Sequence, residues 1–442
     1  MSGALEVVQP GLCTTVQDLG RPGFQRYGVP ASGPMDEWGL RVANALVGNA
    51  PADAVLEVTG VGPVLRIRGE LILAVAGAEF VLGLDGQPVS PFAAFTAREG
   101  QVLTFGECRS GVRAYLAAAG GIDVPPVMRS RSTCLSGRYG GLGGRALREG
   151  DVLPIHVPDA GTRPDARAGA RFLPRRLRPR PAPHLELRVV LGPQEDAFTA
   201  EGIATFLGCE YRVTAHADRM GCRLDGPPIA HVKGADIISD AIASGAIQVP
   251  GDGKPIVLLA DRQTTGGYTK IGAVIRPDLP ALAQARAGDR VRFRQVGLAE
   301  AHAAVAAFAA GLREVQAALL APPPRARLDV ILDGARRVVE LEETAGGFLA
   351  EVDGREFEVG PAAGPADPAG QARVRSPLPG VVAQVHVAPG AVVASGARLV
   401  TLLAMKLQHE VTAAAPGTVA AVHTAPGQEV RAGEVLVEIA PA

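Results

Sequence analysis

A short pattern near the C-terminus occurs twice, and this repeat restricts the fold more than any other feature of the chain. The pattern starts at Pro379 as PGVVAQVHVAPG and again at Pro416, 37 residues later, as PGTVAAVHTAPG. Each copy places alternating residues between Pro-Gly and Gly turns, which is typical of short, half-buried strands. Two copies of one strand pattern predict two half-barrels related by a pseudo-twofold axis.

The segment between the two copies carries a lysine, Lys406. The predicted hairpin that joins the two halves lies at the end of the domain opposite the chain termini, so the amine of Lys406 is fully exposed. Only four of the 44 basic residues are lysines, at Lys233, Lys254, Lys270 and Lys406. Where arginine is the usual cation, a retained primary amine indicates a task that a guanidinium cannot perform, such as acylation. The alternative is that Lys406 is simply a solvated lysine in a turn.

Residues 371–442 resemble the biotinyl/lipoyl family over their whole length. Ala404-Met405-Lys406 matches the biotinyl signature, whereas lipoyl domains usually carry an acidic residue before the lysine. The resemblance implies a flattened β-barrel with biotin attached covalently to Lys406 by a biotin protein ligase. Leu403 departs from the family, in which biotinyl domains usually have Glu, and this bears on how efficiently the ligase recognises the hairpin.

Charge and cysteine content exclude several classes of function. The net charge of -1 argues against a general binder of nucleic acids or anionic membranes. The five cysteines are scattered and form no CxxC pair, so neither a disulfide framework nor a metal site is predicted. The N-terminus lacks the regions of a signal peptide, and the most apolar run, near Leu71, ends before Glu79. We therefore expect a cytoplasmic protein.

The rest of the chain indicates a mainly β protein with two lobes. Residues 1–157 contain short β-rich runs, such as residues 71–76 and 102–105, and one clear helix at residues 36–47. Residues 158–184 are rich in Arg and Pro and predict an extended linker. A nucleic-acid patch is the less favoured alternative, because no aromatic stacking platform is interleaved with the arginines. Residues 185–297 form a second β-rich lobe, whose last strand weakly echoes the end of the first.

An amphipathic helix is predicted at residues 298–321, where apolar residues step by three, four or seven. Three prolines end it. Residues 325–370 predict a small β segment followed by a flexible Gly/Ala/Pro linker. Such a linker would allow the C-terminal domain, residues 371–442, to move relative to the rest of the chain.

Several motifs in the two lobes point to one family. They are QDLGRPG at 17–23, SGPMD at 32–36, ANALVGN at 43–49, AGGI at 119–122, SRST at 130–133, RMGCRL at 219–224, GAIQVP at 245–250 and DRQTTGGY at 261–268. Together they resemble the allophanate hydrolase subunit two family, also called the KipA family, which occurs in urea amidolyase/urea carboxylase and as one subunit of bacterial 5-oxoprolinase. The resemblance implies two cyclophilin-like β-barrels that form one half of a carboxyltransferase. The other half is a companion subunit-one protein, and a separate biotin carboxylase must carboxylate the biotin.

The reaction centre is expected at residues 261–270, because the apolar run 256–260 predicts a buried strand that delivers this polar segment. Carboxyl transfer needs donors that stabilise charge on the ureido oxygen and a base for the acceptor. Asp261 is the candidate base. The candidate donors are Arg262, Gln263, Tyr268 and Lys270, and the candidate carboxylate-binding pair is Arg219 and Arg223. The structural alternatives are a tight turn at Gly266-Gly267 and an Asp261–Arg262 ion pair.

These observations predict a biotin-dependent carboxyltransferase subunit with its own biotin carrier domain. The expected acceptor is a small amide-like nitrogen compound such as urea. One alternative is a component of an ATP-dependent 5-oxoprolinase, in which the carrier is an accessory. Another is a KipA-like regulatory binding protein, for which biotin has no evident use.

Overall fold

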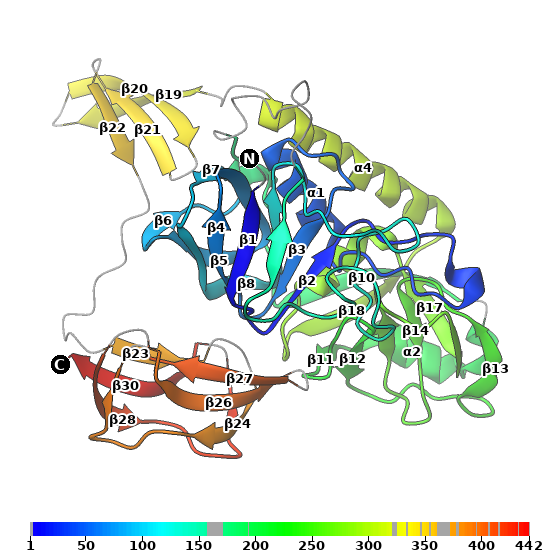
Figure 1. Ribbon diagram of the computed structural model, residues 1–442. Helices are drawn as coiled ribbons and strands as arrows, with labels where there is room; N and C mark the ends of the chain where they lie inside the picture. The colour runs from blue at the N-terminus through cyan, green and yellow to red at the C-terminus, as the bar shows by residue number, and fades with distance from the viewer. Residues whose placement is uncertain are drawn as a thin grey trace.

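The computed structural model describes residues 3–156, 171–192, 194–320, 325–332, 335–344, 347–352, 355–359, 372–376, 380–394, 396–404, 407–413, 416–431 and 433–441. Figure 1 shows two lobes in contact, blue and green, with a long helix, α4, across them. A small four-stranded sheet and the C-terminal strands stand at two other sides of the lobes. The fold is mainly β, as the sequence predicts.

The first lobe is a sheet that, within the described residues, has nine strands. Its order is β2-β3-β8-β4-β1-β9, and the long strand β5 pairs with β6, β7 and β8. Apolar side chains such as Leu56, Leu65 and Leu73 form its core. The strands are β1 (Ala4–Gln9), β2 (Cys13–Gln17), β3 (Val55–Thr59), β4 (Val64–Arg68), β5 (Leu71–Leu84), β6 (Gln87–Val89), β7 (Ala94–Ala97), β8 (Val102–Ala118) and β9 (Val152–Pro154).

Helix α1 (Glu37–Val47) covers one face of this sheet. Asp36 begins it, because its side chain accepts a hydrogen bond from the Gly39 amide at 2.9 Å. Gly48 ends it in the left-handed conformation, with φ 80°, which glycine adopts without a Cβ penalty. The buried face, which includes Leu40 and Leu46, packs on strands β5 and β8.

The second lobe closes into a barrel with the order β10-β17-β14-β15-β12-β11-β18. Two lobes of one kind were expected, but the described strands of the first form an open path rather than a closed ring. The strands are β10 (His184–Leu191), β11 (Tyr211–Val213), β12 (Gly221–Asp225), β14 (Ala246–Gln248), β15 (Ile256–Leu258), β17 (Lys270–Val274) and β18 (Arg290–Gln295). Outside the barrel lie the ribbon of β13 (Asp236–Ala241) with β16 (Thr265–Tyr268), and the helices α2 (Ala200–Gly208) and α3 (Leu279–Ala283).

Part of the segment expected as an extended linker packs on the first lobe instead. Leu173 is fully buried, and its amide donates to the Phe92 carbonyl at 2.7 Å. The Ala94 amide donates to the Arg171 carbonyl at 2.7 Å. A short 3-10 turn at Arg175–Leu177 follows. We call residues 171–180 the strap, because they tie the inter-lobe connection to the first lobe.

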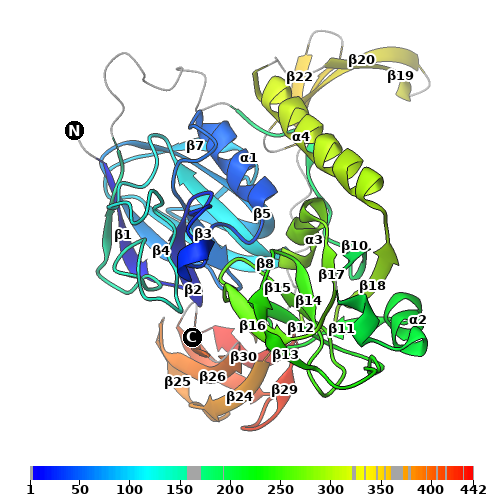
Figure 2. The ribbon, with the colours of Figure 1, turned by 90° about the vertical axis from the view of Figure 1, so that its right-hand side faces the viewer.

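Helix α4 (Leu298–Leu320) agrees with the predicted helix. Its Val315 and Leu319 pack in the same cluster as Leu40 of α1. By length and composition alone α4 is long and apolar enough to cross a membrane, a property that the sequence patterns above did not indicate. Figure 2 shows α4 lying beside α1. The small sheet that follows consists of β19 (Arg325–Leu332), β20 (Ala335–Thr344), β21 (Gly347–Val352) and β22 (Arg355–Val359).

The C-terminal domain shows the predicted repeat as two four-stranded sheets. Strand β24 (Gly380–Val385) corresponds to β28 (Gly417–Val422), β25 (Val392–Val393) to β29 (Glu429–Val430), and β26 (Arg398–Ala404) to β30 (Val435–Pro441). The remaining strands are β23 (Ala372–Arg375) and β27 (Leu407–Thr412). Residues equivalent in the repeat share one core, for example Val382 with Val419 and Leu399 with Leu436. The repeat therefore encodes a barrel with two related halves.

Candidate active site

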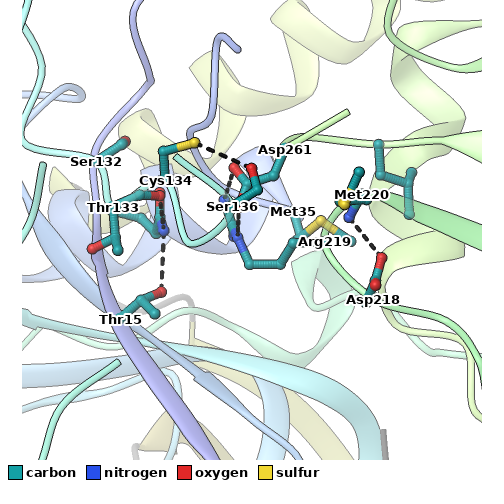
Figure 3. A network of polar contacts seen from close by, with 12 residues as sticks. Thr15, Met35, Ser132, Thr133, Cys134, Ser136, Asp218, Arg219, Met220 and Asp261 are labelled. Carbon is teal, nitrogen blue, oxygen red and sulfur yellow. Dashed lines mark hydrogen bonds and ion pairs between the residues drawn. The ribbon is translucent and has the colours of Figure 1, made fainter. Parts of the chain in front are cut away.

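Arg219 joins the two lobes through a buried network of ion pairs and hydrogen bonds. It lies in the turn between β11 and β12, and its Nε donates to Asp261 Oδ2 at 2.9 Å. Nη2 donates to Asp261 Oδ1 at 3.2 Å and to the Gly33 carbonyl of the first lobe at 2.7 Å. Nη1 donates to Glu57 Oε1, also of the first lobe. Figure 3 shows Arg219 and Asp261 pointing toward one another.

Glu57 is fixed by further donors of the first lobe. Its Oε2 accepts from the Met35 amide and from the Tyr115 hydroxyl, each at 2.8 Å. The same hydroxyl accepts from the Asp36 amide at 2.7 Å. Glu57 and Asp261 are 1% and 2% exposed, so two carboxylates that water cannot reach share one guanidinium as their counter-charge. We call Glu57, Arg219 and Asp261 the interlobe triad.

A second buried contact between the lobes involves Gln284 and Asp36. Gln284 Nε2 donates to Asp36 Oδ2 at 2.8 Å, and its Oε1 accepts from the amides of Val112 and Arg113 at 2.9 and 3.0 Å. Burial raises the pKa of Asp36 to about 6, and the negative charge of Glu57 adds to this, while the hydrogen bonds from Gly39 and Gln284 act in the opposite direction.

The free energy of unfolding is expected to decrease as the pH rises from about 4 to about 6, because Asp36 loses its proton in this range. Its pKa of about 6 in the folded state lies above the 3.8 of the free carboxyl, so the folded state binds more protons in this range and loses stability as the pH rises. A shift of about two units corresponds to roughly 3 kcal/mol. Asp36→Asn keeps an N-cap oxygen for Gly39 and should flatten this dependence in urea unfolding at a series of pH values. An unchanged slope in the variant would exclude Asp36 as its source.

Asp261, the candidate base, is held in a structural position. Both of its oxygens accept hydrogen bonds from the guanidinium of Arg219. The alternative Asp261–Arg262 ion pair is absent among the described contacts, because Arg262 donates to the carbonyls of Leu259 and Ile242. Burial lowers the pKa of Arg262. Arg223 is exposed on β12 and takes no part in the triad.

Residues 261–270 do not form the loop that the sequence suggests. Thr265–Tyr268 is strand β16, which pairs with β13, and Lys270 begins β17. Gly266 and Gly267 therefore lie in an extended strand rather than in the tight turn of the structural alternative. Tyr268 is 42% exposed at the end of this strand.

A cluster of polar side chains lies between the barrel wall and the β13–β16 ribbon. Gln248 of β14 and Lys270 of β17 are direct partners in register. Their neighbours Ile247 and Ile271 are in the barrel core. Because side chains alternate along a strand, Gln248 and Lys270 lie on the other face, toward the ribbon. We call Gln194, Asp240, Gln248, Gln263 and Lys270 the amide cluster.

The contacts of the amide cluster leave one buried donor with neither a hydrogen bond nor an ion pair. Lys270 Nζ and Gln194 Nε2 each lie 3.1 Å from Asp240 Oδ2, and the Lys270 ammonium lowers the pKa of Asp240. Gln263 Nε2 lies 3.5 Å from Gln248 Oε1. Gln248 Nε2 is buried and has no hydrogen-bond partner among the described residues. Such an unpaired amide costs free energy unless a ligand or water satisfies it.

Four residues of the interlobe triad and the amide cluster were missed from the sequence, namely Glu57, Gln194, Asp240 and Gln248. Glu57 stands in a strand that is buried at every position, and Gln248 stands in the fully buried strand β14. A polar residue inside an apolar strand was the available signal. The sequence contains no such signal for Asp240, because its carboxylate contacts Lys270 only as a result of the pairing of β13 with β16.

Lys406, the residue predicted to bear biotin, lies outside the described residues. The strands on either side of it, β26 and β27, pair up to Ala404 and Leu407. Leu403 is 45% exposed and lines a cleft of about 1090 Å³ between this domain and the second lobe. Thr214 and His216, from the turn that also carries Arg219, line the opposite side of the cleft. No three His, Cys, Asp or Glu side chains are grouped as metal ligands in the described part of the chain.

Comparison with known proteins gives two family matches. The model described as "Carboxyltransferase domain, subdomain A and B" matches residues 27–295, and the model described as "Biotin-requiring enzyme" matches residues 372–439. The chain is 36% identical over 297 residues to a 5-oxoprolinase subunit of Escherichia coli (strain K12), with 67% of this chain and 93% of that protein covered.

Two solved structures extend these matches. The K. lactis urea amidolyase is 29% identical, with a TM-score of 0.66, 80% of this chain and 23% of that chain covered. The Kluyveromyces lactis urea carboxylase is similar in fold over 99% of this chain and 66% of that chain, with a TM-score of 0.72 and 18% identity.

Proposed function

Because the chain belongs to the family of the carboxyltransferase domain, subdomain A and B, and ends in a biotinyl domain, we propose that it transfers a carboxyl group to an amide-like nitrogen acceptor such as urea. The family matches make it a component of a biotin-dependent enzyme with covalently attached biotin. The class of carboxyl acceptor and the attachment of the biotin to Lys406 are the two parts of the proposal.

The observation that carries the acceptor class is the unpartnered Nε2 of Gln248. It can donate to the carbonyl oxygen of a small amide, while the carboxylate of Asp240 accepts an N–H from the same molecule. Lys270 lies beside both and would stabilise negative charge that develops on the acceptor. The amide cluster thus offers one donor, one acceptor and one cation, which complements a urea-type compound.

Biotin would supply an activated carboxyl group that the carrier domain brings to the lobes. The cleft beside Leu403 supports this delivery, because its far wall is the β11–β12 turn. That turn ends in Arg219, so the interlobe triad holds the turn at a fixed position against the first lobe. We assign Arg219 and Asp261 to positioning the turn, and Asp240, Gln248 and Lys270 to binding the acceptor.

The partners proposed are a companion subunit-one protein, a biotin carboxylase and a biotin protein ligase. The test is to reconstitute the chain with the first two after biotinylation and to measure ATP hydrolysis that depends on added acceptor. Urea or a related small amide should stimulate it. If neither these compounds nor 5-oxoproline has an effect, the proposed acceptor class is excluded.

A second function is a component of a 5-oxoprolinase, in which the carrier domain is an accessory. It is favoured by the 36% identity to the 5-oxoprolinase subunit of Escherichia coli over 93% of that protein. In the same assay this function predicts stimulation by 5-oxoproline and none by urea. Lys406→Ala should then leave the turnover intact.

The neighbouring glycines of β16 provide a matched test of the amide cluster. A Cβ at Gly266 would lie 2.6 Å from Gln248 Nε2, whereas a Cβ at Gly267 would have its nearest contact at 3.5 Å, with the Ile237 carbonyl. Gly266→Ala should therefore displace the Gln248 amide and lower kcat/KM for the acceptor by about tenfold or more. Gly267→Ala should retain nearly the parental value. Equal effects of both substitutions would contradict a role for Gln248.

A further inference from the structure

The cleft between the carrier domain and the second lobe has a defined surface on each side. Figure 1 shows the end of the carrier domain with β26 and β27 beside β11. On the lobe side, the turn after β11 lines the cleft with Thr214, Ala215 and His216, and Ala287 lies with them. We call the carrier side the docking face. Its side chains outside the carrier core are Val381, Leu403, Glu429, Arg431 and Glu434.

Strand pairing places two apolar residues next to each other on the docking face. Leu403 of β26 and Val381 of β24 are direct partners in register, and Val381 also pairs with Glu429 of β29. Their chain neighbours Leu402 and Val382 are fully buried in the core of the carrier domain. Because side chains alternate along a strand, Leu403 and Val381 point outward, and Leu403 is 45% exposed.

The charged residues of the docking face are two carboxylates and one guanidinium, Glu429, Glu434 and Arg431. A glutamate in place of Leu403 would add a third carboxylate to the same wall, and this group would lose water when the carrier domain closes on the lobe. Leucine has no such cost, and its methyl groups match Ala215 and Ala287 on the opposite wall. The departure of Leu403 from the biotinyl pattern therefore suits the surface that it faces.

We propose that the docking face is the surface by which the carrier domain binds its own second lobe, and that Leu403 is the side chain that makes this binding selective. Because the carrier domain is covalently joined to the lobes, a small apolar contact is sufficient for docking. Lys406 follows Leu403 by three residues, so docking holds its hairpin beside the turn that carries Arg219. The inference rests on the proposed function, because docking serves to deliver the biotin.

Hydrogen–deuterium exchange of the full-length protein tests the docking without any carboxyl acceptor. Undocking opens the cleft to solvent, so Leu403→Glu should raise the exchange rate of amides in residues 212–218 by about fivefold or more. Leu403→Met keeps an apolar side chain of similar volume and should stay within about twofold of the parent. Leu403 lies outside the carrier core, and a matched urea unfolding curve confirms that each variant folds.

Val392 provides the control. It is another apolar residue of the carrier domain, 83% exposed on β25, but it does not line the cleft. Val392→Glu should leave the exchange of residues 212–218 within about twofold of the parent, because surface changes away from a contact have small effects. The proposal is overturned if Leu403→Glu leaves this exchange unchanged, or if Leu403→Met or Val392→Glu raises it as much as Leu403→Glu.

Turnover gives a second readout and separates this inference from the proposed function. In the reconstituted reaction, corrected for the biotinylated fraction, Leu403→Glu should lower kcat by about fivefold or more and leave KM for the acceptor unchanged. The acceptor site is intact in this variant, whereas the carrier domain docks less often. A changed KM at constant kcat would contradict a role in docking. If no acceptor stimulates the parent protein, the proposed function fails, while the exchange result still decides the docking.

Discussion

Replacing Lys406 with arginine is expected to abolish biotin attachment, and with it all carboxyl transfer that depends on biotin. Arginine keeps the positive charge but has no primary amine that a ligase can acylate. After co-expression with biotin protein ligase, a streptavidin blot should show a strong signal for the parent protein and none for Lys406→Arg. The reconstituted acceptor-dependent reaction should fall to the background without the carrier.

Lys254→Arg is the matched control for this experiment. Lys254 is a turn residue whose amide bonds to Asp252 and whose Nζ lies 2.8 Å from Asp225. Its replacement should leave both the blot and the turnover unchanged. A signal that persists in Lys406→Arg, or that disappears in Lys254→Arg, would show that the biotin is attached elsewhere.

Loss of Arg219 is expected to destabilise the protein by about 3–5 kcal/mol, because it leaves two buried carboxylates without a counter-charge. In Arg219→Met the side-chain length is nearly kept while the guanidinium is removed, so Glu57 and Asp261 face one another in a site with no access to water. Urea unfolding of the parent and the variant measures the difference. The variant should also lose acceptor-dependent turnover, because the turn beside the cleft is no longer held.

Two further variants separate loss of charge from loss of packing. Glu57→Gln and Asp261→Asn in the Arg219→Met background remove both unpaired charges and should restore much of the stability. Arg276→Met breaks an exposed pair with Glu37 that also joins the lobes, and should cost less than about 1 kcal/mol. A small effect of Arg219→Met, or no recovery in the triple variant, would contradict the interlobe triad as a stabilising contact between the lobes.

Sequence patterns predicted those parts of the protein that depend on contiguous residues. The helix of Glu37–Val47 agrees with the helix predicted at residues 36–47. The helix of Leu298–Leu320 follows from its apolar spacing. At the proposed acceptor site, Gln263 and Lys270 were chosen because they follow a buried strand.

Predictions that depended on the pairing of distant segments were less complete. The polar segment after β15 was expected as a loop, yet Thr265–Tyr268 becomes a strand because β13 supplies the hydrogen bonds. The strap was expected as an extended linker, yet Leu173 packs in the apolar cluster that α1 and α4 share. Local propensity contains no information about such partners, because the free energy that stabilises these segments comes from burial against residues far along the chain.

The sequence by itself determined the carrier domain. Its repeat, its turns and the residues around Lys406 are local, and equivalent positions such as Val382 and Val419 have the same environment. Only the tertiary structure decided what the arginines and carboxylates of the lobes do. Arg219 meets Glu57 across 162 residues of chain, and a charge of this kind can be buried only where folding brings its counter-charges to it.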